Sequence, residues 1–260
     1  MESTGLQILS VDEFYARAAA LWPETESRWR AGIEAEAERL HELFSEGVGR
    51  SALDCTCGEG TQALALARLG WQVTGTDCVE ASLATAAARA EGLGLAVNFA
   101  RCDVRELGAT SLGRFDLVLS CMALDNLVED GAIEAAIYSM TGRLAAGGNC
   151  YIRLRDFGQL MSRRLRYEVR EERETASGRR LRLEDWHYED DNHVVYVQAY
   201  LADAARPWET EHIALRRRIV RRTDLEAALH AAGLLYIRFL DKRDEWGPVE
   251  VVASGLAPGR

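Results

Sequence analysis

The segment from Leu53 to Thr61 reads L-D-C-T-C-G-E-G-T and places two glycines between a short apolar run and a helix-forming run. Ala52 to Cys55 is predicted to be a strand and Thr61 to Leu69 a helix. Gly58 and Gly60 allow the backbone to pass close to a ligand where a side chain would clash. In an open α/β sheet, nucleotide-like ligands bind where a strand ends and a glycine turn leads into a helix. This segment therefore predicts both a fold class and a candidate site.

The rest of the chain alternates strand and helix patterns around this loop. Six further strands are predicted, at residues 71–76, 96–101, 115–121, 150–154, 236–240 and 249–253. Helices are predicted at residues 80–90, 133–144 and 223–232. This alternation is typical of an α/β protein with a mainly parallel, doubly wound sheet, here of seven strands, the last two forming a hairpin.

Two segments fall outside the alternation. Residues 11–45 have a helical pattern, which Pro23 divides into two helices. Beyond Asp156, residues 158–177 are predicted to form a charged helix. Antiparallel strands are predicted at 181–186, 194–200 and 212–219. We therefore expect four parts: N-terminal helices at 1–50, a core at 51–157, an antiparallel insertion at 158–217, and a C-terminal helix and hairpin at 218–260.

Acidic residues stand at the ends of three consecutive predicted strands. Asp54 precedes the glycine loop, Asp77 ends the second strand, and Asp103 follows the third. A dinucleotide-binding loop needs a third glycine, but Ala63 stands in that position. A carboxylate at Asp77 suits ribose hydroxyls, and Asp103 with the backbone N–H of Val104 suits an adenine edge. An acid at Asp54 would repel a pyrophosphate but suits a cationic group, so the pattern favours an adenosine that carries a positive centre.

Charge limits the classes of partner. The chain has 31 Lys and Arg against 41 Asp and Glu, a net charge of −10. Nucleic-acid binding depends on basic side chains that neutralise phosphates, so we expect a small-molecule substrate and no nucleic acid. The basic clusters at 163–166 and 216–222 are interleaved with acids and are predicted to be solvated surface. The sequence leaves a homo-oligomer open.

Membrane, metal and export patterns are weak in this sequence. No apolar run reaches the roughly eighteen residues of a membrane span, and the first residues lack the pattern of a secretory signal. Cys55 and Cys57 form a C-x-C pair with no second pair at zinc-ligand spacing, so no metal is expected. Cysteines in apolar runs favour a reducing, cytoplasmic location.

On these motifs the chain resembles the class I S-adenosylmethionine-dependent methyltransferases, over nearly all its length. The loop at 53–61 is similar to their first motif, 71–77 to their second strand with its ribose acid, and 144–148 to their L-x-P-G-G turn with Ala146 in place of proline. The resemblance implies a Rossmann-like fold, a methyltransferase activity and S-adenosylmethionine as cofactor. The cofactor residues it implies in the core are Asp54, Thr56, Gly58, Gly60, Asp77, Asp103, Val104 and Cys121.

A closer similarity is to the glycine and sarcosine N-methyltransferases. In that family aromatic residues on N-terminal helices close over the cofactor, which implies a lid at 1–50 with cofactor contacts from Tyr15, Trp22 and Trp29. An arginine motif after the fifth strand holds the substrate carboxylate, and Arg155 matches that arginine. The motif departs from the family after Asp156, where it continues as Phe157-Gly158.

The run after the fourth strand also departs from this group. Met122 stands where the family often has an asparagine, and Asn126 stands where it has a histidine. These departures make glycine itself a doubtful substrate. Asn126 and Tyr196 are further candidate substrate residues, although Tyr196 suits a core position equally well. No residue is assigned as a catalytic acid or base.

The predicted function is methyl transfer to a small soluble acceptor, first to the nitrogen of an amino acid or related amine. An O-methyltransferase of a small metabolite is the alternative enzyme. A non-catalytic module that binds S-adenosylmethionine and regulates a partner is the alternative from a different class.

Overall fold

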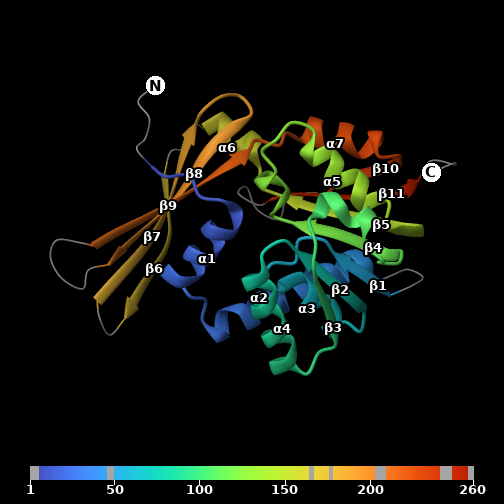
Figure 1. Cartoon of the computed structure of the whole chain (residues 1–260), viewed down its shortest axis with the longest axis horizontal. Helices are drawn as coiled ribbons and strands as arrows, with labels where there is room; N and C mark the ends of the chain where they lie inside the picture. Colours follow the sequence, from blue (N-terminus) through green and yellow to red (C-terminus); the bar gives the residue numbers. More distant parts are fainter. Residues whose placement is uncertain are drawn as a thin grey trace. The chain divides into compact units, whose positions relative to one another are not determined.

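The computed structural model describes residues 6–45, 50–163, 167–175, 178–202, 209–240 and 248–256 (Figure 1). It divides the chain into two compact units. The first, here called the insertion unit, combines the chain up to Glu24 with Phe157–Val220. The second, the core unit, combines Thr25–Asp156 with the chain from Arg221 onward. The structure thus groups the N-terminal residues differently from the expected 1–50 part, because the chain passes from one unit to the other after Glu24.

The core unit is built on a seven-stranded sheet. Its strands are β1 Ser51–Asp54, β2 Gln72–Asp77, β3 Val97–Arg101, β4 Phe115–Cys121, β5 Leu144–Leu154, β10 Leu234–Phe239 and β11 Val249–Leu256. They lie in the order β10-β11-β5-β4-β1-β2-β3. The strands from β1 to β5 are parallel, and β11 pairs antiparallel with both β5 and β10. The predicted fold class is confirmed.

Helices cover both faces of this sheet. They are α2 Glu26–Phe44, α3 Thr61–Arg68, α4 Glu80–Leu93, α5 Ala132–Thr141 and α7 Arg222–Ala231, with short helices at Val104–Ala109 and Leu124–Asn126. In Figure 1, α2, α3 and α4 gather on one face and α5 and α7 on the other. Ile33, Leu40, Leu64 and Leu119 are buried in the cluster under the first group. Such apolar faces are what the helical periodicity of the sequence predicts.

The insertion unit is a four-stranded antiparallel sheet with two helices. Its elements are α1 Val11–Leu21, α6 Phe157–Arg163, β6 Tyr167–Thr175, β7 Gly178–Tyr188, β8 His193–Ala202 and β9 Glu209–Arg218, and the strand order follows the sequence. Ser10 begins α1 with a capping box that it forms with Glu13. Phe14, Trp22, Trp186 and Tyr196 are buried together in this unit.

The helix predicted at 158–177 is wrong. Helix α6 ends at Arg163, and Tyr167–Thr175 form strand β6 instead. The charged residues of this run have good helix propensity, but ion pairs with β7 favour the strand: Arg170 pairs with Glu184 at 2.8 Å and Glu172 with Arg179 at 3.3 Å. Cross-strand pairs of this kind override local propensity.

The basic cluster at 216–222 is not uniformly solvated. Arg216 is exposed and pairs with Glu189 at 2.7 Å. Arg217, in contrast, is only 1% exposed, and its guanidinium stacks 4.7 Å from the ring centroid of Tyr196. The prediction of a solvated face is therefore wrong for Arg217, because β9 turns this side chain toward the interior of the insertion unit. Of the other basic cluster, residues 164–166 lie outside the described residues.

None of the described helices is long and apolar enough to cross a membrane.

Candidate functional site

The glycine loop lies at the carboxyl end of β1, where the strand order reverses. Strand β1 has β2 on one side and β4 on the other, and their carboxyl ends form the edge at which open α/β sheets bind ligands. The loop is held from inside by two backbone hydrogen bonds: Cys57 donates to Thr76 at 2.9 Å, and Gly60 donates to Cys57 at 2.8 Å. The loop therefore has a fixed path from strand to helix.

The two glycines serve different purposes. Gly58 has φ of +50° and Gly60 has φ of +92°, a region that L side chains rarely adopt. A Cβ at Gly60 would lie 3.0 Å from the Cβ of Ala86, so this glycine lets α4 pack closely against the loop. A Cβ at Gly58 would meet nothing within 4 Å, so the space in front of this residue is open. Gly58, rather than Gly60, faces the room a ligand needs.

Asp54 is a fully buried acid directly beneath this loop. No hydrogen bond of good geometry reaches either of its carboxylate oxygens from the described chain, although the backbone N–H groups of Thr56 and Ala63 lie near them. Burial is the main cause that raises the pKa of Asp54 to about 7; the charges of Asp77 and Glu36 act in the same direction, and the backbone N–H groups of Thr56 and Ala63 act against it. An unpaired buried carboxylate is unfavourable. A cation bound above the loop would stabilise its ionised form.

Asp77 ties the glycine loop to the end of β2. Its Oδ2 accepts a hydrogen bond from the backbone N–H of Gly58 at 2.8 Å, and its Oδ1 accepts one from Val79 at 2.9 Å. These two bonds fix the carboxylate at the end of β2. Asp77 is half-buried and so reaches both the loop and the ligand side.

The carboxylate of Asp103 already forms an ion pair with a neighbouring arginine. It accepts from the backbone N–H of Arg105 at 2.8 Å and forms a two-point ion pair with the Arg105 guanidinium, at 2.9 and 2.6 Å. Hydrogen bonds from Arg105 hold the pKa of Asp103 below its usual value. Val104 is buried at the start of the short helix that Asp103 caps. An adenine amine at Asp103 would have to share this carboxylate with Arg105.

The end of β4 contributes the remaining part of the edge. The Thr56 hydroxyl lies 2.8 Å from that of Ser120, which joins the loop to β4. Cys121, the last residue of β4, is buried, and burial raises the pKa of its thiol well above the usual value. Met122 follows with φ of +58°, a conformation that costs energy in a residue with a side chain. This strained residue lies at the carboxyl edge of the sheet, directly after β4.

A buried ion pair links β4 to β5 at the same edge. Arg155 follows β5, and its Nε lies 3.5 Å from Oδ2 of Asp125, which has no exposed surface. Asn126 is the next residue and is half-buried. Arg155 therefore stands at the edge where it was predicted, but its charge is balanced by Asp125.

A known protein family is similar in sequence to this part of the chain. Residues 52–148 match the family described as "Methyltransferase domain". This match supports the predicted enzyme class for residues 52–148.

Curated relatives are similar over the same region. The chain is 35% identical over 128 residues to a ubiquinone biosynthesis O-methyltransferase of Bordetella avium, covering 48% of this chain and 53% of the relative. It is 31% identical over 125 residues to the protein of that name in Psychrobacter cryohalolentis, covering 47% of each. The chain thus matches about half the length of these curated relatives. The resemblance holds for the methyltransferase class, and the narrower one to glycine and sarcosine N-methyltransferases stays a prediction.

Solved structures share the fold over almost the whole chain. One is CalS10, an amino pentose methyltransferase from Micromonospora echinaspora bound to S-adenosylmethionine, with a TM-score of 0.71, 19% identity, and coverage of 95% of this chain and 98% of that one. Another is the sugar N-methyltransferase KedS8 from Streptoalloteichus, with a TM-score of 0.67, 21% identity, and coverage of 97% of each chain. At these identities the similarity shows the fold alone.

Trp29 is the one aromatic lid candidate in the same unit as the methyltransferase domain. It lies on α2 and lines a groove between α2 and α4. The guanidinium of Arg30 lies 4.8 Å from its ring centroid, and that of Arg89 lies 5.1 Å away. The arginines contact the indole ring, and its role in cofactor binding stays a prediction.

The other aromatic candidates lie in the insertion unit. The Tyr15 hydroxyl accepts a hydrogen bond from Arg217 at 3.3 Å, and Trp22 donates to Glu171 at 3.1 Å. Tyr196 is 1% exposed, and its hydroxyl donates to Glu184 at 2.5 Å. A substrate could reach Tyr196 only if this packing opened. The contacts within the insertion unit do not test the predicted cofactor roles of Tyr15 and Trp22 or the substrate role of Tyr196. These roles stay predictions.

Sequence reasoning missed several partners of the predicted residues. Arg105, Asp125 and Arg89 were not singled out, although each holds or contacts a residue of the site. Glu36 on α2 was also missed: it is 8% exposed and accepts from both terminal nitrogens of Arg153 at 2.8 Å. Glu36 could have been noticed in the sequence, because it is an acidic residue among the apolar positions of a predicted helix.

Proposed function

We propose that the whole chain transfers the methyl group of S-adenosylmethionine to a small acceptor bound at the carboxyl ends of β1, β4 and β5. The observation that carries this proposal is Asp54, a carboxylate at the end of β1 that is fully buried and whose pKa burial raises to about 7. S-adenosylmethionine supplies a methyl group on a positively charged sulfur together with an α-ammonium group. A cation above the loop would favour the ionised form of Asp54, which burial disfavours.

The residues of this edge fit the cofactor in complementary ways. Asp54 has no exposed surface, so it acts on the cofactor through its charge rather than by contact. Asp77 holds Gly58 and stands at the end of β2, where ribose hydroxyls would bind. Thr56, Gly58 and Val104 offer backbone groups along the same edge. Asp103 and Cys121 stay candidate contacts, Asp103 on the condition that it shares its carboxylate with Arg105.

Catalysis by such a site consists chiefly of positioning. The protein must hold the acceptor's lone pair in line behind the methyl carbon, which replaces a bimolecular encounter by a bound geometry. An amine must lose its proton before it can attack. Exclusion of water and orientation of the acceptor are therefore the main tasks of the residues after β4 and β5.

We place a small amine first among the acceptors. Asp54, Asp77, Asp103 and Asp125 lie at one edge of the sheet, against the charges of Arg105 and Arg155. A surplus of acids attracts cations, and an amine arrives as an ammonium ion. Methylation of oxygen is the second candidate, because the relative from Bordetella avium at 35% identity is named an O-methyltransferase. A non-catalytic binding module would hold the cofactor without turnover, and the cytoplasmic location stays a prediction.

The test is a transfer assay with the full chain and radiolabelled S-adenosylmethionine. Amino sugars, amino acids, simple amines and phenols are offered separately, and both labelled product and S-adenosylhomocysteine are quantified. We expect turnover with at least one amine. Turnover only with phenols would move the proposal to oxygen, and cofactor binding without turnover on any acceptor would favour the regulatory module.

A further inference from the structure

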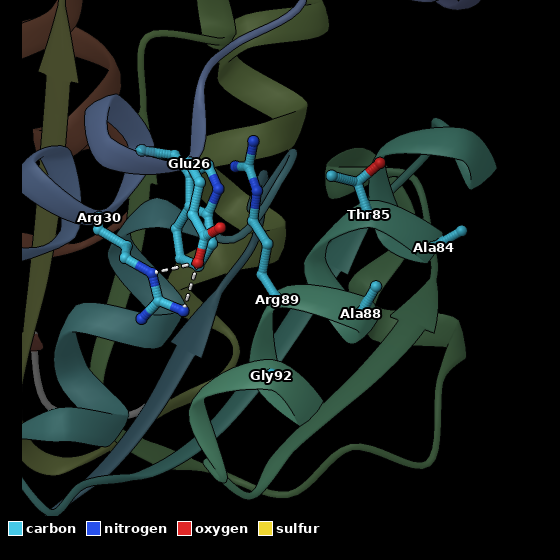
Figure 2. Close-up of a pocket in the computed structure, with 8 residues that line it drawn as sticks. Glu26, Arg30, Ala84, Thr85, Ala88, Arg89 and Gly92 are labelled. Atoms are coloured by element: carbon cyan, nitrogen blue, oxygen red, sulfur yellow. Dashed lines mark hydrogen bonds and ion pairs between the residues drawn. The ribbon is translucent and has the colours of Figure 1, made fainter.

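A groove lies between α2 and α4 in the core unit. Its volume is about 520 Å³, and Trp29, Arg30, Thr85, Ala88 and Arg89 are among the residues that line it (Figure 2). Figure 2 also shows the ion pair between Arg30 and Glu26 at the α2 side of this groove. Arg89 differs from Arg30 because its ion-pair partner belongs to the loop.

Arg89 holds the loop residue Glu59 at two points. One terminal nitrogen donates to the backbone carbonyl of Glu59 at 3.2 Å, and the other donates to its carboxylate at 2.5 Å. The Arg89 side chain is only 10% exposed. Its guanidinium also lies 5.1 Å from the centroid of the Trp29 ring. The arginine thus connects α2, α4 and the loop.

The position of Glu59 makes this contact significant. It lies between Gly58 and Gly60, so Arg89 holds the residue that separates the two glycines of the loop. From the inside, the same segment is held by Asp77, which accepts from Gly58 at 2.8 Å. The loop is therefore held by hydrogen bonds from two residues. Asp77 holds it at the carboxyl end of β2, and Arg89 holds it from the groove.

We propose that Arg89 is a positioning residue that keeps the glycine loop in its cofactor-binding conformation, with Trp29 supporting its guanidinium. This inference rests on the proposed function, since it concerns the affinity of the same cofactor site. A loop ordered before binding does not lose that conformational freedom when the ligand arrives, and the affinity rises accordingly. A largely buried, two-point contact also holds its geometry better than an exposed ion pair.

The first measurement is the affinity for S-adenosylhomocysteine by calorimetry. Arg89→Ala should weaken binding about tenfold, the loss that corresponds to one buried charged hydrogen bond. Arg89→Lys keeps the charge but lacks the planar fork, so it should lie between Arg89→Ala and the wild type. Arg30→Ala is the matched control, because it removes the other cation near Trp29 and leaves Glu59 untouched; it should bind within about twofold of the wild type.

A spectroscopic measurement separates positioning from general destabilisation. Fluorinated tryptophan is incorporated, and the fluorine NMR line of Trp29 is assigned by its loss in Trp29→Phe. We expect this line to shift when S-adenosylhomocysteine binds to the wild type and to Arg30→Ala, and to shift much less in Arg89→Lys. If Arg89→Ala does not fold, Arg89→Lys carries both measurements.

The outcomes distinguish the inference from the proposed function. If the wild type does not bind S-adenosylhomocysteine, the proposed function fails. If the wild type binds and the Arg89 variants bind equally well, or Arg30→Ala weakens binding as much as Arg89→Ala, the positioning role of Arg89 is overturned.

Discussion

At the scale of single residues, Asp54 links pH to both folding and binding. Burial raises its pKa to about 7 in the folded protein, above the value of an exposed aspartate. The unfolded chain therefore releases this proton first, and the free energy of unfolding of the ligand-free protein falls as pH rises from about 4 to about 7. We expect Asp54→Asn to lose less thermal stability than the wild type between about pH 5 and about pH 8, as measured by calorimetry in matched buffers.

The same carboxyl predicts how cofactor affinity depends on pH. A cationic cofactor favours ionised Asp54, so affinity for S-adenosylmethionine should rise by up to about tenfold between about pH 6 and about pH 8. In Asp54→Asn the affinity should be lower and nearly independent of pH. Titration calorimetry at several pH values measures both effects. An equally steep profile in Asp54→Asn would show that another group is responsible.

Asp77 predicts a second effect, because it serves the loop and the ligand together. Asp77→Ala removes the acceptor for Gly58 at 2.8 Å as well as the proposed ribose contact. Affinity for S-adenosylhomocysteine should fall by about tenfold or more, as expected for a lost charged hydrogen bond. Asp77→Asn keeps one acceptor oxygen and should fall less. A variant that loses thermal stability but retains affinity would limit Asp77 to the loop.

At the scale of elements, the core could be predicted from the sequence and β6 could not. Apolar runs, glycine turns and helical periodicity all specify β1, α3 and β2 locally, so propensity and tertiary structure agree there. The segment Tyr167–Thr175 has mixed charges, and its strand conformation depends on pairing with β7, which no local pattern encodes. Tertiary pairing therefore decided the element that sequence reasoning got wrong.

The candidate site divides in the same way. The positions of Asp54, Gly58 and Asp77 could be predicted because Asp54 and Asp77 each end a strand and Gly58 lies in the loop after β1. Their partners are far away in sequence: Arg89 contacts a loop residue 30 positions earlier. Asp125 and Arg155 are likewise joined only by the parallel pairing of β4 and β5. A single sequence predicts where a residue lies along a strand or helix. It does not predict which distant residues the fold brings into contact.

The junction of β4 and β5 predicts the charge of the acceptor. Because Asp125 already balances Arg155, the wild type should favour amines without a carboxylate over matched amino acids. Asp125→Asn leaves Arg155 available, so it should raise kcat/KM for the carboxylate-bearing acceptor relative to the other by about tenfold. Arg155→Lys in the same background should reverse that gain, since a lysine lacks the paired donors. An unchanged ratio in Asp125→Asn would mean that Arg155 does not contact the acceptor.

At the scale of the whole molecule, the insertion unit and the core unit must cooperate if the predicted lid exists. Tyr15 and Trp22 belong to the insertion unit, whereas the glycine loop belongs to the core unit. If these aromatic residues close over the cofactor, saturating S-adenosylhomocysteine should slow amide hydrogen exchange in residues 11–22 by ordering the segment. Strand β8 is the internal control, because its central residues are buried within the insertion unit and should exchange equally with and without ligand.

A variant separates closure from direct stabilisation of the helix. Trp22→Phe keeps an aromatic ring but removes the indole N–H that donates to Glu171 at 3.1 Å. If Trp22 acts only within the insertion unit, this change should raise exchange in residues 11–22 without altering cofactor affinity. If Trp22 also covers the cofactor, affinity should fall and the ligand-dependent protection should shrink together. Full affinity combined with exchange that the ligand leaves unchanged would confine both aromatic residues to the insertion unit, and the lid would have to be sought on α2, where Trp29 lies.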